Sequence, residues 1–172
     1  MATPYDQKHT SIIALKGHNK EGMPQSLAYN YLHFITSTKH RQPFIQPDIQ
    51  EKLYGYMSGI CKNIESPVIQ IGGMDDNIHL LTILSKKIML IDFVEQVKKD
   101  SSKWMKLQGS QYSKFYWQGG YGMFSVNPRE IDVVANYIRT QKEQHQKMKF
   151  QAEYREFLKR YQIPYDERYV WD

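Results

Sequence analysis

The chain has 172 residues, of which 41% are hydrophobic, and its formal net charge is +5. This length and apolar content suit one globular domain and exclude a chain that is disordered throughout. The positive charge favours an anionic partner such as nucleic acid. The single cysteine, Cys61, excludes an internal disulfide framework, so we expect a protein of the reducing cytoplasm.

Three segments are predicted along the chain. Residues 1–22 are polar and have no hydrophobic period, which predicts a flexible N-terminal extension. Patterned sequence follows over 23–149 as the main domain, and 150–172 is expected to form a C-terminal helix and tail. No apolar run approaches the roughly 20 residues of a membrane span, so we expect a soluble protein with no membrane partner.

The first half of the main domain predicts a strand, a helix and a hairpin. Alternating side chains over 27–36 indicate a strand with both faces partly covered. Pro47 then opens a helix whose apolar residues follow the helical period to about Ile64. Two further strands, 68–74 and 78–84, are joined by an acidic turn, and a hairpin is the simplest arrangement.

The second half adds helices and one strand. A helix starts at about Lys87 and runs toward Trp104, and an aromatic segment after it ends in a strand over 121–126. An asparagine followed by a proline then begins a long helix over 127–147. A shorter amphipathic helix ends before Pro164.

This order of elements predicts the fold class. Strand, helix, strand, strand, helix and strand, with helices appended, is typical of an α+β ferredoxin-like (split βαβ) fold, in which an antiparallel sheet carries helices on one face. The other face of the sheet would be open to a ligand. Because this fold hosts many functions, the function has to be inferred from the site.

The second strand of the hairpin contains a candidate metal site. Residues two apart on a strand share a face, so Asp75, Asn77 and His79 project together if the strand extends back to Asp75. Oxygen and imidazole groups of this kind can bind a divalent metal. A lone strand histidine is more often structural, and the alternative is a buried His79 that is hydrogen-bonded within the sheet.

The long helix contains a candidate nucleophile. Tyr137 and Gln141 are one helical turn apart and therefore lie on the same side of the predicted helix. The apolar stripe faces elsewhere, which places Tyr137 at the edge of the buried face. The chain has 13 tyrosines, so the alternative role of Tyr137 is packing.

Together these segments resemble a known family. They are Met23-Pro24-Gln25-Ser26-Leu27, Ser37-Thr38-Lys39-His40-Arg41, Gly72-Gly73 with Asn77-Ile78-His79-Leu80-Leu81, and Tyr137-Ile138-Arg139-Thr140-Gln141. In this order and spacing, the chain resembles the single-tyrosine HUH transposases of small bacterial insertion sequences, the IS200-like transposases. The resemblance covers roughly 23–147.

The resemblance implies a metal-dependent DNA transposase, with 23–149 as its catalytic domain. Such an enzyme cleaves and rejoins single-stranded DNA beside hairpins at the element's ends, acts as a homodimer and needs no nucleotide cofactor. By position, it implies that Tyr137 forms a 5′-phosphotyrosine intermediate. It also implies that His79 and Gln141, with Asn77, hold the divalent metal, Mg²⁺ or Mn²⁺.

Asn77 departs from the family pattern, because it stands where the first histidine of the motif is expected. An amide oxygen can bind Mg²⁺, but it is a weaker ligand than imidazole for Mn²⁺. Either Asp75 or Asp76 compensates, or the metal affinity falls and the chain is a weakened or inactive relative. The alternative function is therefore that of a catalytically weakened or domesticated relative, a noncatalytic module that binds hairpin or single-stranded nucleic acid.

Candidate DNA contacts lie at the end of the first strand and in the aromatic segment. Lys39, His40 and Arg41 could bind phosphates, and Tyr121 could stack on an unpaired base. The alternatives are a solvated charge cluster and an aromatic part of the core.

Overall fold

The structure is a computed structural model, and it describes residues 27–145, 150–168 and 170. The expected extension over 1–22 lies outside the described residues. The strands are β1 Asn30–Ser37, β2 Val68–Gly73, β3 Asn77–Leu84 and β4 Gly122–Ser125. The α-helices are α1 Pro47–Asn63, α2 Leu90–Lys106, α3 Ile131–Arg139, α4 Gln141–His145 and α5 Phe150–Arg160. Short 3-10 turns occur at η1 Lys39–Arg41, η2 Ser110–Tyr112 and η3 Pro128–Glu130.

The strands form one sheet in the order β2-β3-β1-β4. Both neighbours of β3 run antiparallel to it, and β4 runs antiparallel to β1. This order is that of two interleaved βαβ units, so the predicted α+β ferredoxin-like class is confirmed. In the register of the central pair, Ile35 lies opposite His79 and Ser37 lies opposite Asn77.

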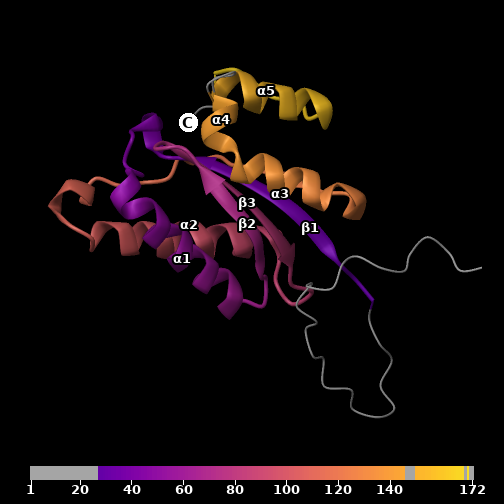
Figure 1. Ribbon diagram of the computed structural model, residues 1–172, viewed down its shortest axis with the longest axis horizontal. Coiled ribbons are helices and arrows are strands. Elements are labelled where there is room, and N and C mark those ends of the chain that lie inside the picture. Colours follow the sequence, from indigo (N-terminus) through magenta and orange to yellow (C-terminus); the bar gives the residue numbers. More distant parts are fainter. Residues whose placement is uncertain (1–26, 146–149, 169, 171–172) are drawn as a thin grey trace, which may run out of the picture.

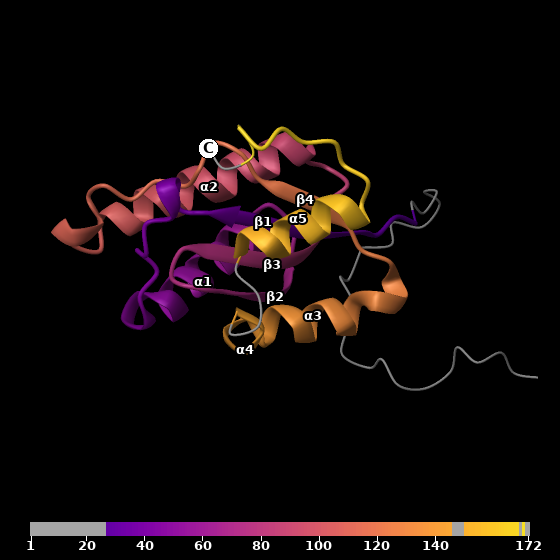
Figure 2. The same ribbon diagram turned by 90° about the horizontal axis from the view of Figure 1, so that it is seen from above.

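Helices cover both faces of this sheet. Helices α1 and α2 pack side by side beneath it, as expected for the ferredoxin-like unit, and α3, α4 and α5 lie over the opposite face (Figure 1). Turned by 90°, α5 crosses the central strands and α3 runs beside β2 (Figure 2). The sheet face that we expected to be open is therefore covered, because the helices after β4 fold back over it.

Alternation along β1 and β3 explains the two layers. Phe34 and Leu80 are fully buried against α1 and α2, in the larger apolar cluster. The next residues along each strand, Ile35 and Leu81, turn to the other face and are fully buried there. Strand side chains alternate in this way because of the pleat, and covering both faces requires apolar residues at nearly every position.

Helix α5 is anchored to the second face by aromatic packing. Its Phe150, Tyr154 and Leu158 form a buried cluster with Ile35 of β1 and Phe124 of β4. None of the helices in the described residues is long and apolar enough to cross a membrane.

The long helix expected over 127–147 is interrupted. A 3-10 turn precedes α3, and the helix breaks at Thr140, where φ is −96° and ψ is 21°. The Thr140 backbone N–H and its side-chain hydroxyl both donate to the carbonyl of Asn136 at 3.0 Å, an extra local bond of the kind that often accompanies a bend in a helix. Gln141 therefore begins a new short helix rather than continuing that of Tyr137.

A glycine brings α3 close to the sheet. A Cβ atom on Gly72 would lie 2.3 Å from the carbonyl oxygen of Ile138, so only glycine permits this approach of helix and strand. The contact fixes α3, which carries Tyr137, at the edge of β2.

Candidate active site

His79 stands at the centre of a buried polar cluster to which β1, β3, α4 and α5 contribute. Its neighbour on β1 is His33, whose Nε2 lies 3.1 Å from Nδ1 of His79. Both imidazoles are buried, His79 completely. The pair forms because Ile35 is opposite His79 and His33 lies two residues away on the same face. Sequence reasoning missed His33, although pairing the first and third strands with faces matched would have found it.

Burial sets the charge of this pair. Desolvation lowers the pKa of His33 to about 3, so this imidazole is neutral at pH 7. A neutral imidazole has one donor and one acceptor nitrogen. In the tautomer in which Nδ1 of His79 donates to His33, Nε2 of His79 keeps the lone pair that a metal ligand needs.

Gln141 and Glu153 complete the cluster from the helical layer. The Gln141 side-chain amide is buried and donates from Nε2 to Oε1 of Glu153 at 3.1 Å. The same carboxylate oxygen lies 3.8 Å from Nε2 of His79. Burial raises the pKa of Glu153 to about 7. Sequence reasoning missed Glu153, because a glutamate on a charged amphipathic helix gives no signal of burial.

Tyr137 lies beside the two histidines of its own chain. Its ring is partly buried, and its centroid is 6.1 Å from that of His79 and 6.5 Å from that of His33, both in edge-on contacts. Phe157 of α5 packs against the same ring at 5.9 Å. The structure thus brings together Tyr137, His79 and Gln141, which the sequence singled out, despite the helix break between Tyr137 and Gln141.

Asn77 is held by a different set of partners. Its Nδ2 donates to Oδ1 of Asp76 at 2.8 Å. Arg41 donates to Oδ2 of Asp76 from Nε at 2.9 Å and from Nη2 at 2.5 Å, and its guanidinium lies 4.8 Å from the ring centroid of Phe150. Asp75 does not share the face of Asn77 and His79, because β3 begins at Asn77 and the Asp75 side chain is exposed.

The candidate DNA contacts have different surroundings. Lys39 and His40 are exposed, whereas Arg41 is engaged with Asp76. His40 and Arg41 both have positive φ, 55° and 54°, a costly conformation that aims Arg41 at the start of β3. Tyr121 is partly buried and packs on Phe34, on the face of the sheet opposite to Tyr137.

The cluster contains donor atoms that suit a cation. Asn77 Oδ1 and Gln141 Oε1 are buried and have no hydrogen-bond partner among the described residues. Orphaned buried oxygens of this kind are costly unless a ligand satisfies them. The described ranges contain no cluster of three or more His, Cys, Asp or Glu side chains arranged for a metal. The available donor set is therefore mixed, with amide oxygens, one imidazole and one carboxylate, which fits a hard cation such as Mg²⁺ or Mn²⁺.

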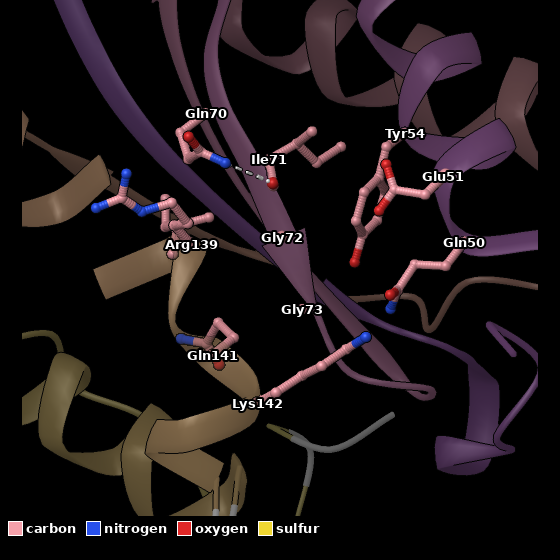
Figure 3. A pocket seen from close by; sticks show the side chains of 11 residues that line it. Gln50, Glu51, Tyr54, Gln70, Ile71, Gly72, Gly73, Arg139, Gln141 and Lys142 are labelled. Atoms are coloured by element: carbon pink, nitrogen blue, oxygen red, sulfur yellow. Dashed lines mark hydrogen bonds between the residues drawn. The ribbon is translucent and has the colours of Figure 1, made fainter. Parts of the chain in front are cut away.

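A pocket of about 370 Å³ adjoins the cluster at the edge of β2. Gln141 and Lys142 face it from α4, and Glu51 and Tyr54 face it from α1 across Gly73 (Figure 3). Gln141 thus belongs both to the lining of this pocket and to the buried cluster.

The chain matches the model of a known protein family. A family model described as "Transposase IS200 like" matches residues 26–141. A search of curated proteins finds no match.

Two solved structures share the fold. One is described as a "putative transposase" of Deinococcus radiodurans R1; it is 21% identical, and the match has a TM-score of 0.54 and covers 69% of this chain and 96% of that one. The other is a REP-associated tyrosine transposase bound to a REP hairpin; it is 12% identical, and the match has a TM-score of 0.54 and covers 72% of this chain and 74% of that one.

Proposed function

Because the chain belongs to the IS200-like transposase family, we propose that it cleaves and rejoins single-stranded DNA at hairpin-marked ends of a mobile element. The observation that carries the proposal is the contact between the Tyr137 and His79 rings, at 6.1 Å between centroids, with Gln141 in the same buried cluster. These are the residues that the family resemblance implies as nucleophile and metal ligands. The REP hairpin bound by one structural neighbour supports hairpin DNA as the ligand class.

Tyr137 is the proposed nucleophile. Its phenol oxygen attacks the scissile phosphorus, a new O–P bond forms, and the bond to the 3′ oxygen of the preceding nucleotide breaks. The phenol releases its proton and the leaving oxygen takes one up, so the products are a 3′-hydroxyl and a 5′-phosphate that stays on Tyr137. A second 3′-hydroxyl reverses the step by attacking the phosphotyrosine. Because the bond energy is conserved in the intermediate, no nucleotide cofactor is needed.

His79, Gln141 and Asn77 would hold the proposed divalent metal, Mg²⁺ or Mn²⁺. When bound, it would neutralise phosphate charge and stabilise the leaving oxygen. Neutral His33 acts as a positioning residue, because its contact with Nδ1 of His79 fixes the ring and the tautomer of that ligand.

Lys39 and His40 are the proposed phosphate contacts, since both are exposed at the end of β1 close to Arg41, which is committed to Asp76. Tyr121 remains a proposed stacking residue on the opposite face of the sheet. A homodimer is proposed as the active assembly.

The test is formation of a covalent protein–DNA adduct. Purified protein is incubated with Mn²⁺ or Mg²⁺ and labelled single-stranded DNA carrying the hairpins that flank its gene, and the products are separated on a denaturing gel. We expect an adduct that Tyr137→Phe abolishes. The matched control is Tyr56→Phe, because Tyr56 is exposed on α1 and stacks on Trp104, away from the cluster. An adduct that persists in Tyr137→Phe would assign the nucleophile elsewhere.

One observation favours a second candidate, a noncatalytic relative that binds hairpin DNA. Asn77 replaces the expected histidine, and its amide nitrogen is bonded to Asp76. Hairpin binding without an adduct in either metal would identify this function.

A further inference from the structure

We propose that Glu153 of α5 is a metal ligand of this site and replaces the histidine whose position Asn77 occupies. The inference rests on the proposed function, because it concerns the same metal. It assigns a role to a residue beyond 26–141, the part of the chain that the family model matches.

The spacing of three side chains supports the proposal. Oε1 of Glu153 is 3.8 Å from Nε2 of His79 and 3.1 Å from Nε2 of Gln141. Nitrogen and oxygen ligands lie about 2.0–2.2 Å from a small divalent cation, so adjacent ligands of one cation are separated by roughly 3–4 Å. The carboxylate is therefore already at the spacing of a neighbouring ligand from both the imidazole and the amide.

The Gln141 amide carries a second indication. Its Nε2 donates to Glu153, while its Oε1 is buried without a partner among the described residues. Turning the amide by 180° exchanges the two atoms and brings the oxygen to the side of the carboxylate. The amide then offers its oxygen to a cation that Glu153 also faces, and its nitrogen gives up the hydrogen bond to the carboxylate.

The burial of Glu153 is compensated within the described residues by one neutral hydrogen bond, from the Gln141 amide. The Glu153 side chain is 10% exposed, and a buried carboxylate normally pairs with a cation or binds a metal. In the described part of the chain, its basic neighbour within ion-pair distance is His79. Aromatic packing holds it in place, since the flanking Phe150 and Tyr154 stack at 5.8 Å and are anchored on β4 through Phe124.

The carboxylates next to Asn77 are not available for this role. Asp76 is bound by both Arg41 and Asn77, and Asp75 is exposed before the strand. Glu153 is therefore the carboxylate that can restore the lost ligand. A carboxylate in place of an imidazole also shifts the preference of the site toward hard cations such as Mg²⁺ and Mn²⁺.

The experiment measures Mn²⁺ binding without DNA, by calorimetry or by loss of the free Mn²⁺ signal in electron paramagnetic resonance. We expect Glu153→Gln, which keeps the shape and removes the charge, to raise the Kd at least tenfold. Glu156→Gln is the matched control, because Glu156 lies on the same helix, is 62% exposed and pairs with Lys159. Asn77→His in the Glu153→Gln background should restore binding, and circular dichroism confirms that each variant is folded.

The outcomes separate this inference from the proposed function. Equal Kd values for Glu153→Gln and the parent protein, or no Mn²⁺ binding by the parent protein, would overturn the role of Glu153. Mn²⁺ binding that depends on Glu153, in a protein that forms no DNA adduct, would support the ligand and overturn the transposase activity. A DNA adduct in a protein whose Mn²⁺ affinity is unchanged by Glu153→Gln would support the transposase activity and overturn the role of Glu153 as a ligand.

Discussion

The two faces of the sheet are built from the same strands but from different chemistry. Toward α1 and α2, Phe34 and Leu80 are fully buried among apolar side chains. Toward α5, the neighbouring strand positions carry His33 and His79, and the helix adds Glu153. Burying apolar surface stabilises a fold, whereas burying titratable groups costs free energy unless they are paired. Both faces bury apolar side chains, and the second face adds a buried polar cluster whose cost the apolar burial must offset.

The sharpest test of this comparison uses adjacent residues of β3. Leu80→Ala should lower the free energy of unfolding by about 2–5 kcal/mol through lost burial and a cavity. His79→Gln should lower it by at most about 1.5 kcal/mol, because a polar side chain of similar size remains, yet it should abolish the DNA adduct. Urea unfolding and the adduct gel measure both quantities. Equal losses of stability in the two variants would mean that the polar face contributes as much to the free energy of unfolding as the apolar face.

The pH dependence of the free energy of unfolding should show how much the buried titratable groups Glu153 and His33 destabilise the fold. A carboxyl whose pKa is raised from 4.5 to about 7 is bound to a proton more tightly in the folded state, so stability falls as the pH rises through this range. His33, with its pKa lowered from 6.5 to about 3, gives the opposite slope and loses stability as the pH falls below 6.5. The two slopes oppose each other between pH 4.5 and 6.5.

Glu153→Gln removes only the first slope. In metal-free buffer, we expect the variant to match the parent protein near pH 4.5 and to exceed its stability by about 3 kcal/mol at pH 8. Urea unfolding at a series of pH values measures this gap. A constant gap from pH 4.5 to 8 would show that Glu153 titrates normally.

The close approach of α3 can be tested with two glycines. Gly72→Ala should destabilise the protein by about 1–3 kcal/mol, because its Cβ would meet the Ile138 carbonyl oxygen at 2.3 Å. It should also reduce adduct formation, since α3 carries Tyr137. Gly55→Ala is the control: no atom lies within 4 Å of its Cβ, and alanine should stabilise α1 by up to about 1 kcal/mol. Equal effects of the two substitutions would contradict the packing argument.

The smallest expected effect concerns the exposed basic residues. Lys39→Ala should weaken hairpin DNA binding several-fold and reduce the slope of log K against log salt by about 0.7, the value for one single-strand phosphate contact. Lys87→Ala is the control, because Lys87 is 74% exposed beyond the far end of β3 and pairs with Glu65. Fluorescence anisotropy at several salt concentrations gives both slopes. An unchanged slope for Lys39→Ala would remove this residue from the DNA contacts.

The sequence predicted the sheet and its helices because their hydrophobic periods are strong and local. It did not predict the break at Thr140, because threonine within an otherwise helical pattern gives no clear local signal for a break. His33 was missed because the alternating pattern predicts a strand but does not distinguish one inward-facing residue from another. Its importance depends on β1 pairing with β3, which joins positions 46 residues apart.

Glu153 shows a different limit of sequence reasoning. The motif from Asn77 to Leu81 is contiguous in the sequence because it lies on one strand. The Glu153 carboxylate comes instead from a helix that folds back over the sheet. Helical charges are normally solvated, so composition gave no reason to select this one. Glu153 faces inward in the folded chain, where its neighbours Phe150 and Tyr154 pack against the sheet and Gln141 donates to its carboxylate.

Arg41 joins parts of the chain that would otherwise vary separately. It binds Asp76, which holds Asn77, and its guanidinium stacks on Phe150 three residues before Glu153. A substitution at Asn77 in β3 can therefore shift Phe150 in α5 through the Arg41 side chain. Among descendants of this gene, we expect substitutions at positions 41, 76, 77 and 153 to be correlated.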